Sequence, residues 1–344
     1  MASSPIVGKI DIHNHFVPPS YAQGGSSTKN GTQHLELEAD TKTAVADAGG
    51  DPSGWQTPAW TTDSAKELMQ KTGISTAILS LTAPGVEVLQ GEAQLRLARE
   101  VNEYAAKLCD QSPQQFGFFA ALPSLLNTEA AIAEIEYSLD TLKADGVTLF
   151  TRYGDGEYYL GHTAFKPIWE VLNQRKTVVF IHPTHPTNTN LVNRALPQPV
   201  LDYPHESAKT ALDLIISGTK RTYPDCKIIL SHGGGTLPFL LSRTAELVSR
   251  LPPNFNAHIT AEEIVETAKT FYLDLALATA PEILDVLLKK FPSERILFGS
   301  DMPYAQEGAV LAYNKYLNQY PLDDNLRKKV ASGNALNLFP RLRN

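Results

Sequence analysis

Two histidines, His13 and His15, stand one residue apart in the stretch KIDIHNHF, directly after an apolar run near the start of the chain. A β-strand directs residues i and i+2 to the same face, so both imidazoles would point the same way from a strand's end. Paired imidazoles suit a divalent metal ion, although such a pair also occurs by chance in a solvated loop or a core. The pair predicts a metal site only if further ligands converge on it.

Three other residues that can bind metal or move protons follow apolar runs of the same kind. His182 follows TVVFI, His232 follows CKIILS, and Asp301 follows RILFGS. His13, His15, His182 and Asp301 would make a four-ligand set for one zinc ion per chain, with manganese as the alternative. His232 would lie near enough to the ion to act as a base. Each residue alone has an ordinary explanation, as a half-buried histidine or a helix cap.

The apolar runs before these residues belong to a regular alternation of strands and helices. Short apolar runs without strict alternation indicate strands that are covered on both faces. Eight runs are predicted as strands: residues 7–12, 76–81, 116–122, 146–150, 177–181, 226–231, 271–276 and 295–300. Stretches with helical spacing lie between and after them: 62–72, 90–111, 127–143, 163–175, 205–219, 236–250, 280–290, 305–319 and 323–333. Eight β/α units predict an α/β fold, a closed (β/α)₈ TIM barrel whose strand ends converge on one pocket.

Two insertions lengthen the chain beyond the roughly 250 residues of a plain barrel. Residues 17–61, rich in Gly, Ser, Thr, Pro and Asp, follow the first strand and would form a lid or rim. Residues 183–204 would form a long loop after the fifth strand, and with no linker in view residues 1–344 are predicted to be a single domain. A doubly wound open sheet is the alternative fold, but its GxGxxG phosphate loop is absent.

The composition restricts the partners and the compartment. The 344 residues carry a net charge of -7 and no basic block, so nucleic acid is excluded as a partner. No run of about 18 apolar residues could span a bilayer, and the N-terminus lacks the pattern of a secretory signal, so we expect a cytoplasmic protein with no membrane partner. Cys109 and Cys226 lie far apart and outside any CxxC pattern, as expected of buried thiols in a reducing compartment.

Five motifs in combination resemble those of the amidohydrolase-related, metal-dependent decarboxylases, which include the aminocarboxymuconate-semialdehyde decarboxylases and the fungal 6-methylsalicylate decarboxylases. The motifs are DIHNHF, FIHP, SHGGGTLPFLLSR, FGSDMPY and SGNALNLF, and the resemblance runs from about residue 8 to residue 339. It implies that His13, His15, His182 and Asp301 bind the metal, commonly zinc, and that His232 acts beside it. It also implies that Arg243 grips a substrate carboxylate, in the semialdehyde enzymes from a neighbouring subunit, so we expect a homodimer.

Two departures from the family pattern narrow the expected chemistry. The semialdehyde enzymes carry another substrate-binding arginine between the first strand and the first helix, but residues 16–95 contain no arginine. The wider hydrolase superfamily often bridges two metals with a lysine that ends the fourth strand, where this chain has Thr151 and Arg152. The resemblance therefore favours one metal and a small aromatic monocarboxylate, such as an ortho-hydroxybenzoate, over a dicarboxylate semialdehyde.

The predicted function is that of a carboxy-lyase, which releases CO₂ without oxidation from an ortho-hydroxybenzoate such as 6-methylsalicylate. Asp301 is expected to protonate the carbon that bears the carboxylate, while His232 helps to set protonation at the metal. Three alternatives stay open. They are a semialdehyde-type decarboxylase, a mononuclear hydrolase of a lactone or amide that uses the same ligands, and a non-catalytic barrel that serves as a binding module.

Overall fold

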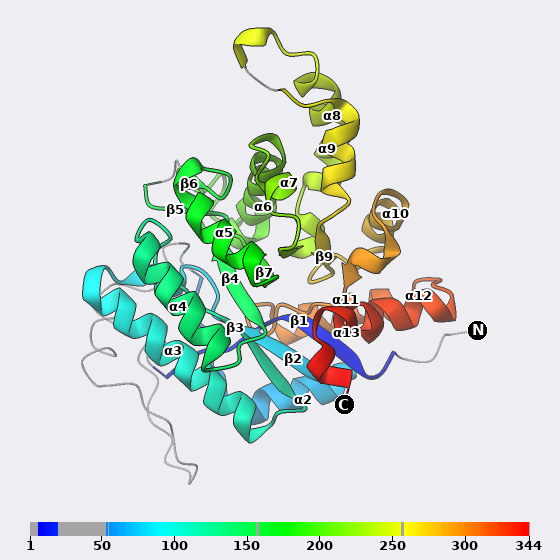
Figure 1. Cartoon of the computed structure of the whole chain (residues 1–344). Coiled ribbons are helices and arrows are strands. Elements are labelled where there is room, and N and C mark those ends of the chain that lie inside the picture. The colour runs from blue at the N-terminus through cyan, green and yellow to red at the C-terminus, as the bar shows by residue number, and fades with distance from the viewer. Residues whose placement is uncertain (1–5, 20–52, 54, 156–157, 256–257, 344) are drawn as a thin grey trace.

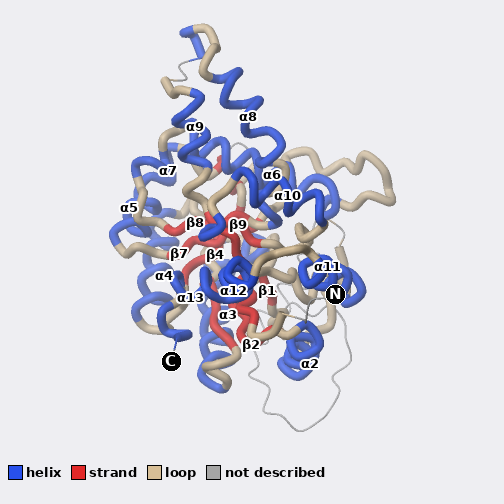
Figure 2. Tube along the Cα trace, turned by 90° about the vertical axis from the view of Figure 1, so that its right-hand side faces the viewer, coloured by secondary structure: helices blue, strands red, loops and turns tan. Residues whose placement is uncertain are grey.

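The computed structural model describes residues 6–19, 53, 55–155, 158–255 and 258–343. Within them, eight parallel strands form one sheet in the order β1-β2-β3-β4-β7-β8-β9-β10. These strands are β1 (Lys9–His15), β2 (Ile74–Ser80), β3 (Phe116–Ala120), β4 (Gly146–Phe150), β7 (Val178–His182), β8 (Lys227–Leu230), β9 (Tyr272–Asp274) and β10 (Ile296–Leu297). They lie at the centre of a ring of helices (Figures 1 and 2). The predicted TIM-barrel-like α/β fold is confirmed.

Backbone hydrogen bonds join the first strand to the end of the last one. Ile12 N donates to Phe298 O at 3.1 Å, and His15 N donates to Met302 O at 2.6 Å. Asp301 N, from the same segment, donates to His13 O at 2.8 Å. The closure of the barrel therefore places the loop that carries Asp301 directly against the histidine-bearing end of β1.

A bulge in β1 decides which of its residues face the barrel interior. Between the pairs Asp11–Ala77 and Asn14–Leu79, β1 advances by three residues while β2 advances by two. The extra residue shifts the pleat by one position. Positions 10 and 12 therefore pack in the inner core, and the rings of positions 13 and 15 also meet on the inner side.

Helices cover the outer face of the sheet. They are α2 (Thr62–Thr72), α3 (Gly91–Gln111), α4 (Thr128–Asp140), α5 (Lys166–Gln174), α6 (Gln198–Ile216), α7 (Thr219–Thr222), α8 (Leu237–Val248), α9 (Ala261–Ala268), α10 (Pro281–Lys290), α11 (Glu307–Gln319), α12 (Asp324–Lys328) and α13 (Asn334–Leu338). The far ends of α8 and α9 project beyond the barrel in both views (Figures 1 and 2). None of the helices in the described part of the chain is long and apolar enough to cross a membrane.

Four elements differ from the sequence prediction. The prediction missed α9, which begins with a capping box between Thr260 and Glu263, and the two-residue strands β5 (Arg152–Tyr153) and β6 (Tyr158–Tyr159). Helix α6 begins at Gln198 and not at residue 205, so the loop after β7 is shorter than predicted. A proline inside a helix removes a hydrogen bond to the carbonyl four residues earlier. Here Pro204 lies inside α6, where the affected carbonyl belongs to Val200, an exposed residue.

A column of aromatic rings supports the first histidine from inside the barrel. Phe339, which follows α13, packs against Phe119 with ring centroids 6.0 Å apart, and Phe119 stacks on Phe180 at 5.4 Å. Phe180 in turn lies 4.9 Å from the ring of His13. All three phenylalanines are buried, and a close-packed interior of this kind leaves His13 little freedom to move.

The two insertions and the cysteines are placed only in part. Residues 20–52 and 54 of the predicted lid lie outside the described residues, while Trp55 from its C-terminal part lines the main cavity. Cys109 is half-buried, Cys226 is buried, and both are free thiols. The lid, and the assignment of residues 1–344 to a single domain, stay predictions.

Candidate metal centre and active site

Four side chains that the sequence predicts as metal ligands meet at the C-terminal end of the barrel. His13, His15, His182 and Asp301 each offer one ligand atom, and these atoms all lie within 4.8 Å of one another. Nε2 of His13 lies 3.1 Å from Nε2 of His15, and Oδ1 of Asp301 lies 3.4 and 3.2 Å from the two nitrogens. Ligand atoms at about 2.0–2.2 Å from one ion would be separated by distances of this order. The four residues therefore fit a single ion.

Hydrogen bonds at the opposite ring nitrogens fix how the three histidines face the centre. Nδ1 of His13 lies 2.9 Å from Oδ2 of Asp274, and Nδ1 of His15 lies 2.9 Å from Oγ of Ser80. Nδ1 of His182 lies 2.8 Å from the carbonyl oxygen of Pro183. A ligating histidine usually donates its second N–H to such a partner, which orients the ring and leaves the other nitrogen for the metal. Nε2 is the ligand atom that this pattern leaves on each ring.

Asp274, at the end of β9, is a positioning residue that the sequence analysis missed. Besides holding His13, its Oδ1 accepts hydrogen bonds from the backbone N–H of His232 at 3.1 Å and of Ala276 at 2.8 Å. One fully buried carboxylate thus positions both a candidate ligand and a candidate base. The signal in the sequence was weak, because Asp274 stands within the apolar run FYLDLA and the predicted strand continued to residue 276, whereas β9 ends at Asp274.

Asp11 performs a similar task for the loop after β10. Its carboxylate accepts hydrogen bonds from Ser300 N at 3.0 Å, from Ser300 Oγ at 2.5 Å and from His13 N at 3.1 Å. Burial raises the pKa of Asp11 to about 6. The next residue, Asp301, has φ of 65°, a left-handed conformation that costs a non-glycine residue roughly 1–3 kcal/mol. The hydrogen bonds at Asp11 therefore help to hold Asp301 in a strained position beside the histidines.

The charges at the centre favour a bound cation. Burial opposes the protonation of His13, but Asp274 and Asp301 outweigh it and raise the pKa of His13 to about 10. Burial lowers the pKa of His15 and holds that of His182 well below its ordinary value. Although burial acts the other way, hydrogen bonds with His13 and His15 hold the pKa of Asp301 well below its usual range. Two buried carboxylates attract positive charge, and the neutral rings of His15 and His182 offer lone pairs that a metal ion binds. A bound ion would displace the proton that His13 otherwise carries.

His232 lies beside the four-ligand cluster without belonging to it. Its ring centroid is 4.7 Å from that of His13 and 6.3 Å from that of His182. Nδ1 lies 3.0 Å from the carbonyl oxygen of Ala276, which requires a proton on Nδ1 and leaves Nε2 as the acceptor. Burial lowers the pKa of His232, so the neutral ring can take up a proton. Its backbone is also left-handed, with φ of 55°.

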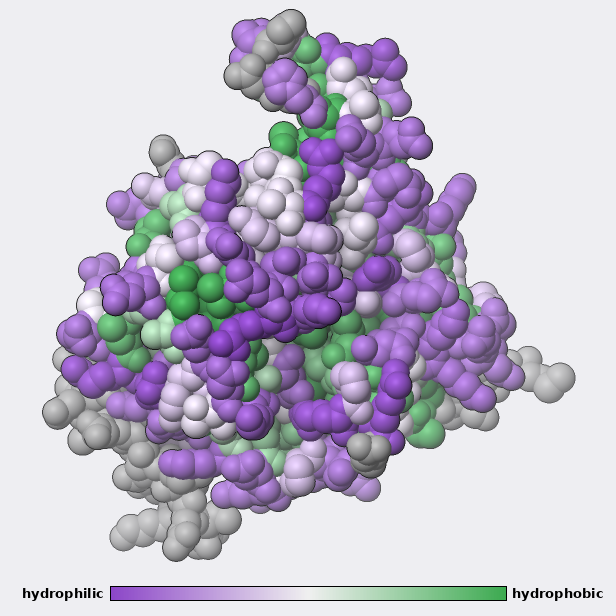
Figure 3. Space-filling view, viewed as in Figure 1, coloured by the Kyte–Doolittle hydropathy of each residue, from purple (hydrophilic) through white to green (hydrophobic). Residues whose placement is uncertain are grey.

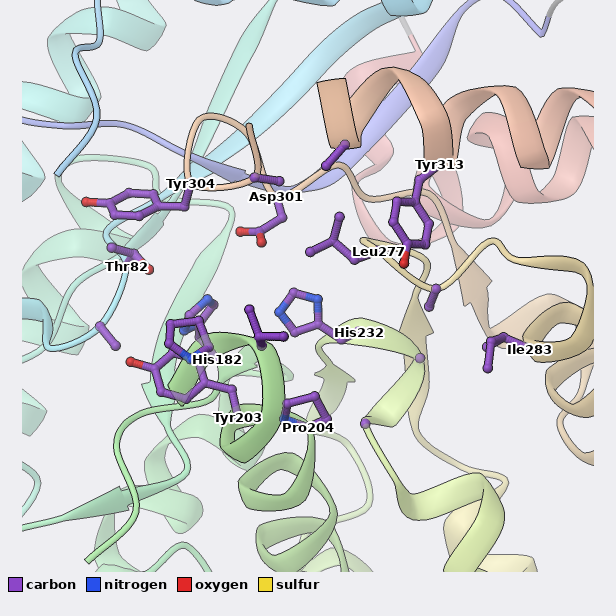
Figure 4. Close-up of a pocket in the computed structure, with 18 of the residues that line it drawn as sticks. Thr82, His182, Tyr203, Pro204, His232, Leu277, Ile283, Asp301, Tyr304 and Tyr313 are labelled. Carbon is purple, nitrogen blue, oxygen red and sulfur yellow. The ribbon is translucent and has the colours of Figure 1, made fainter. Parts of the chain in front are cut away.

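A cavity of about 520 Å³ opens above these residues. His182, His232 and Asp301 form part of its wall, and Figure 4 shows their side chains pointing into the same space. Thr82, Tyr203 and Tyr304 bring hydroxyl-bearing side chains to one side, while the other side is mainly aliphatic, with Tyr313 beside Leu277. Among the described residues that line the cavity, none is arginine or lysine. A ligand's anionic group would therefore depend on a bound ion, since the described lining offers no cationic side chain.

Arg243, the predicted carboxylate anchor, does not lie in this cavity. It is exposed on α8, outside the described lining residues. A role in the site of its own chain is therefore unsupported, and the role that the resemblance implies would require a second subunit. Thr151 and Arg152, in place of a bridging lysine, make structural contacts: Arg152 Nε donates to His185 O at 2.6 Å, and Thr151 Oγ1 accepts from Thr184 N at 3.2 Å.

The comparison with known families agrees with this arrangement. The model of the amidohydrolase family matches residues 10–341, nearly the whole chain. The chain belongs to the amidohydrolase family. The chain is 46% identical over 338 residues to the 6-methylsalicylic acid decarboxylase of Penicillium expansum, with 98% of each chain covered. It is 26% identical over 343 residues to the gamma-resorcylate decarboxylase of Rhizobium radiobacter, with 96% of this chain and 98% of that one covered.

A solved structure resembles this amidohydrolase over its whole length. It is the dihydroxybenzoic acid decarboxylase of Polaromonas sp. with bound manganese and the inhibitor 2-nitroresorcinol. The TM-score is 0.78 at 25% identity, and 98% of each chain is covered. The resemblance to metal-dependent aromatic decarboxylases that the motifs indicated is confirmed.

Replacing Asp274 by asparagine is expected to weaken metal binding about 10–100-fold, because the partner that orients His13 would lose its charge. Competition with a chelator of known affinity measures this, with Asp225→Asn, at an exposed aspartate, as the control. An unchanged affinity would show that Asp274 does not orient a ligand.

Proposed function

We propose that this member of the amidohydrolase family is a metal-dependent, non-oxidative decarboxylase of a 2-hydroxybenzoate such as 6-methylsalicylate. One observation carries the proposal: a cluster of three histidines and an aspartate lies at the floor of a cavity whose described lining is mainly apolar. An aromatic ring suits such walls, and an anchored carboxylate suits such a floor. The similarity of the chain to a 6-methylsalicylic acid decarboxylase and to a gamma-resorcylate decarboxylase supports this proposal.

We propose one divalent ion per chain, held by Nε2 of His13, His15 and His182 and by a carboxylate oxygen of Asp301. This donor set is typical of zinc, and manganese is the alternative because the similar Polaromonas enzyme holds it. When bound, such an ion acts as a Lewis acid that offsets the negative charge of the carboxylate and the phenolic oxygen, an effect worth several kcal/mol. The choice of metal is decided by elemental analysis of the purified protein, followed by reconstitution with each ion.

The chain's own residues then have to move one proton. Asp301 is a carboxylate at neutral pH. It would take a proton from the phenolic hydroxyl of the bound substrate, whose acidity a bound ion would raise. It passes this proton to the ring carbon that bears the carboxylate, and a new C–H bond forms there. The bond between that carbon and the carboxylate then breaks, its electron pair returns to the ring, and CO₂ leaves. His232 relays a proton from water to the phenolic oxygen of the product.

Protonating the carbon before the bond breaks avoids a localised carbanion on the ring. The ring loses aromaticity briefly and regains it as CO₂ departs. Asp301 suits this step because Oδ1 faces His13 and His15, at 3.4 and 3.2 Å, which leaves Oδ2 for the proton. General acid catalysis by a positioned carboxyl contributes about 10²–10⁴-fold.

The cavity favours a monocarboxylate over the dicarboxylate semialdehyde. A second buried carboxylate needs a cationic or hydrogen-bonding partner, and without one its burial costs several kcal/mol. The described lining of one chain contains neither arginine nor lysine, and its hydroxyl groups are neutral donors that offset the burial of a charge only in part. A single carboxylate beside a phenolic oxygen meets the cluster without this cost.

The proposed function is tested by incubating the metal-loaded protein with 6-methylsalicylate. Trapped CO₂ and 3-methylphenol in equal amounts are the expected products. A hydrolase is the alternative that the same ligand set allows, and it would open a lactone or an amide and release no CO₂. Hydrolysis without decarboxylation across a panel of hydroxybenzoates would contradict the proposal, and the absence of both activities with full metal content would favour a binding module.

We also propose that two copies pack through the projecting ends of α8 and α9 to form the predicted homodimer. This arm exposes large apolar side chains: Leu247 is 51% exposed and Phe255 61%. Phe239, at the start of the same helix, is 56% exposed and lines the cavity. Figure 3 shows a narrow strip of hydrophobic side chains between hydrophilic ones on the projection. Apolar surface gathered on a protruding element is typical of a protein interface. Arg243 lies on the same helix and would reach the partner's cavity.

Arg243→Ala is expected to raise KM about tenfold or more, because a hydrogen bond to a charged group contributes roughly 1.5–3 kcal/mol. Steady-state kinetics measure the change, and Arg250→Ala, on the same arm and paired with Glu246, is the control. Specific activity should also fall on dilution as the mass measured by light scattering halves. A monomer with full activity would contradict this role. The cytoplasmic location stays a prediction.

A further inference from the structure

The cavity has two chemically different sides around the reactive residues. In Figure 4, His182 lies toward Thr82 and Tyr203 on one side of the cavity, whereas Leu277 and Ile283 lie on the other. Asp301 and His232 stand between them. Thr82 and Tyr203 therefore bring hydroxyl groups to the side of the metal ligand, whereas the side away from it is mainly aliphatic and carries the hydroxyl of Tyr313 beside Leu277.

The mainly aliphatic side of the cavity is here called the α10 branch, and Tyr313 lies there beside Leu277. Its aliphatic members come from the segment after β9, from α10 and from α8, and they are Leu277, Ala278, Ile283, Val286, Leu287 and Pro238. Leu287 and Ala278 are buried. A Cβ added at Gly233, next to His232, would lie 3.2 Å from Leu287 Cδ1 and 3.3 Å from Ala278 Cβ. The branch thus begins directly beside the candidate base.

The reactive residues and the α10 branch are built from the same short segment. Ala276 accepts from Nδ1 of His232 and donates to Asp274, and Leu277 follows it with φ of 53°. A left-handed backbone is uncommon for leucine, and it is found where the surroundings fix a side chain in a required position. The hydrogen bonds that orient His232 therefore also fix Leu277 at the entrance of the branch.

The cavity is larger than one small aromatic acid requires. Its volume of about 520 Å³ lies within the range of roughly 300–1,000 Å³ that is typical of pockets for drug-sized ligands. A hydroxybenzoate with a methyl group is much smaller than such a ligand. The space in the α10 branch is therefore available to a substituent on the ring.

The position of that substituent follows from the orientation of the ring. The carboxylate and the neighbouring phenolic oxygen must both face the metal ligands, and the carbon that bears the carboxylate must face Asp301. When the phenolic oxygen lies on the side of His182, position 6, the other ring carbon next to the one that bears the carboxylate, lies on the side of the cavity where Leu277 stands. On the basis of the proposed function, we infer that the substrates of this enzyme are 2-hydroxybenzoates with an apolar chain longer than methyl at position 6, and that the α10 branch binds the chain.

Competition between substrates of increasing chain length tests the inference. The series is salicylate and its 6-methyl, 6-propyl and 6-pentyl derivatives, with 4-pentylsalicylate as the positional control. Because burial of each methylene is worth about 0.8 kcal/mol, kcat/KM is expected to rise with length at position 6, up to about fourfold per methylene. The 4-pentyl isomer should be the poorer substrate. A kcat/KM that falls below that of 6-methylsalicylate with each added carbon, or a preference for the 4-pentyl isomer, overturns the inference.

Two substitutions of one residue localise the effect. Ile283→Trp fills the branch and should lower the ratio of kcat/KM for 6-pentyl over 6-methyl at least tenfold, whereas Ile283→Ala should raise it. Glu282→Trp, at the exposed neighbouring position on α10, is the matched control and should leave the ratio unchanged. If the ratio of kcat/KM were the same in all three variants, the alkyl substituent would bind outside the α10 branch. Binding of the products 3-methylphenol and 3-pentylphenol gives a second readout, and the pentyl compound should bind more tightly.

The two proposals fail in different ways. If no 6-substituted salicylate releases CO₂ from metal-loaded protein, the proposed function is wrong. If 6-methylsalicylate is decarboxylated but salicylates with longer alkyl chains at position 6 are not, the proposed function stands. The inference that the α10 branch binds such a chain is then wrong.

Discussion

Removal of the metal by a chelator is expected to lower the rate of CO₂ release by at least about 10³-fold, because both the anchor for the carboxylate and the charge that offsets it are lost. Dialysis against fresh zinc or manganese should restore the rate when the metal content returns to one ion per chain. The melting temperature should fall as well, since an ion at a free concentration of 1,000 times its Kd stabilises the folded state by about 4 kcal/mol.

A matched pair of histidine variants separates loss of the ion from other effects. His182→Ala removes one of the four proposed ligands and should lose metal and activity together. His205→Ala, at an exposed histidine, should lose neither. Full activity of a protein that elemental analysis finds free of metal would refute the proposed centre.

Asp301→Asn is expected to lower kcat by about 10²–10⁴-fold even when metal is supplied in excess. Asparagine keeps an oxygen for the ion and nearly the same shape, but it cannot take a proton from the phenol and pass it to the ring. KM should change much less than kcat, because the lost interaction is made mainly in the transition state. Steady-state kinetics with 6-methylsalicylate, paired with elemental analysis, measure both quantities.

Two further variants sharpen this result. His232→Ala leaves all four proposed ligands in place and should lower kcat by about 10²-fold or more through the lost proton relay. Asp225→Asn, at an exposed position, should behave as the unmodified enzyme. If Asp301→Asn retained near-normal turnover with its metal bound, another group would have to deliver the proton.

The barrel could be predicted from the chain because its signals are local. Runs such as TVVFI and CKIIL carry the apolar residues that a strand covered on both faces needs, and each is followed by a stretch with helical spacing. Parallel strands joined by helices place their C-terminal ends at one face. His13, His182 and Asp301 could therefore be assigned to one site before any distance was known.

The supporting residues were harder to predict because their role depends on distant partners. Asp274 and Asp11 are single carboxylates within apolar strands, and neither stands in a pattern that names a metal. Their hydrogen bonds to His13 and to Ser300 cross 261 and 289 residues of chain. For Arg243 the family resemblance implied a substrate anchor, but its side chain is exposed on α8 and does not line the cavity of its own chain.

The sequence by itself determined the strand order and the identity of the four candidate ligands, because these depend on local patterns of apolar residues and on which residue ends each strand. Only the tertiary structure decided how those ligands face one another. The bulge in β1 turns both histidines inward, the contacts of β1 with the segment after β10 bring Asp301 to 3.2 Å from His15, and α10 adds the apolar wall beside His232. The physical reason is that hydrogen bonds between strands far apart in the chain set both the pairing register, which decides the face on which each side chain lies, and the closure of the barrel.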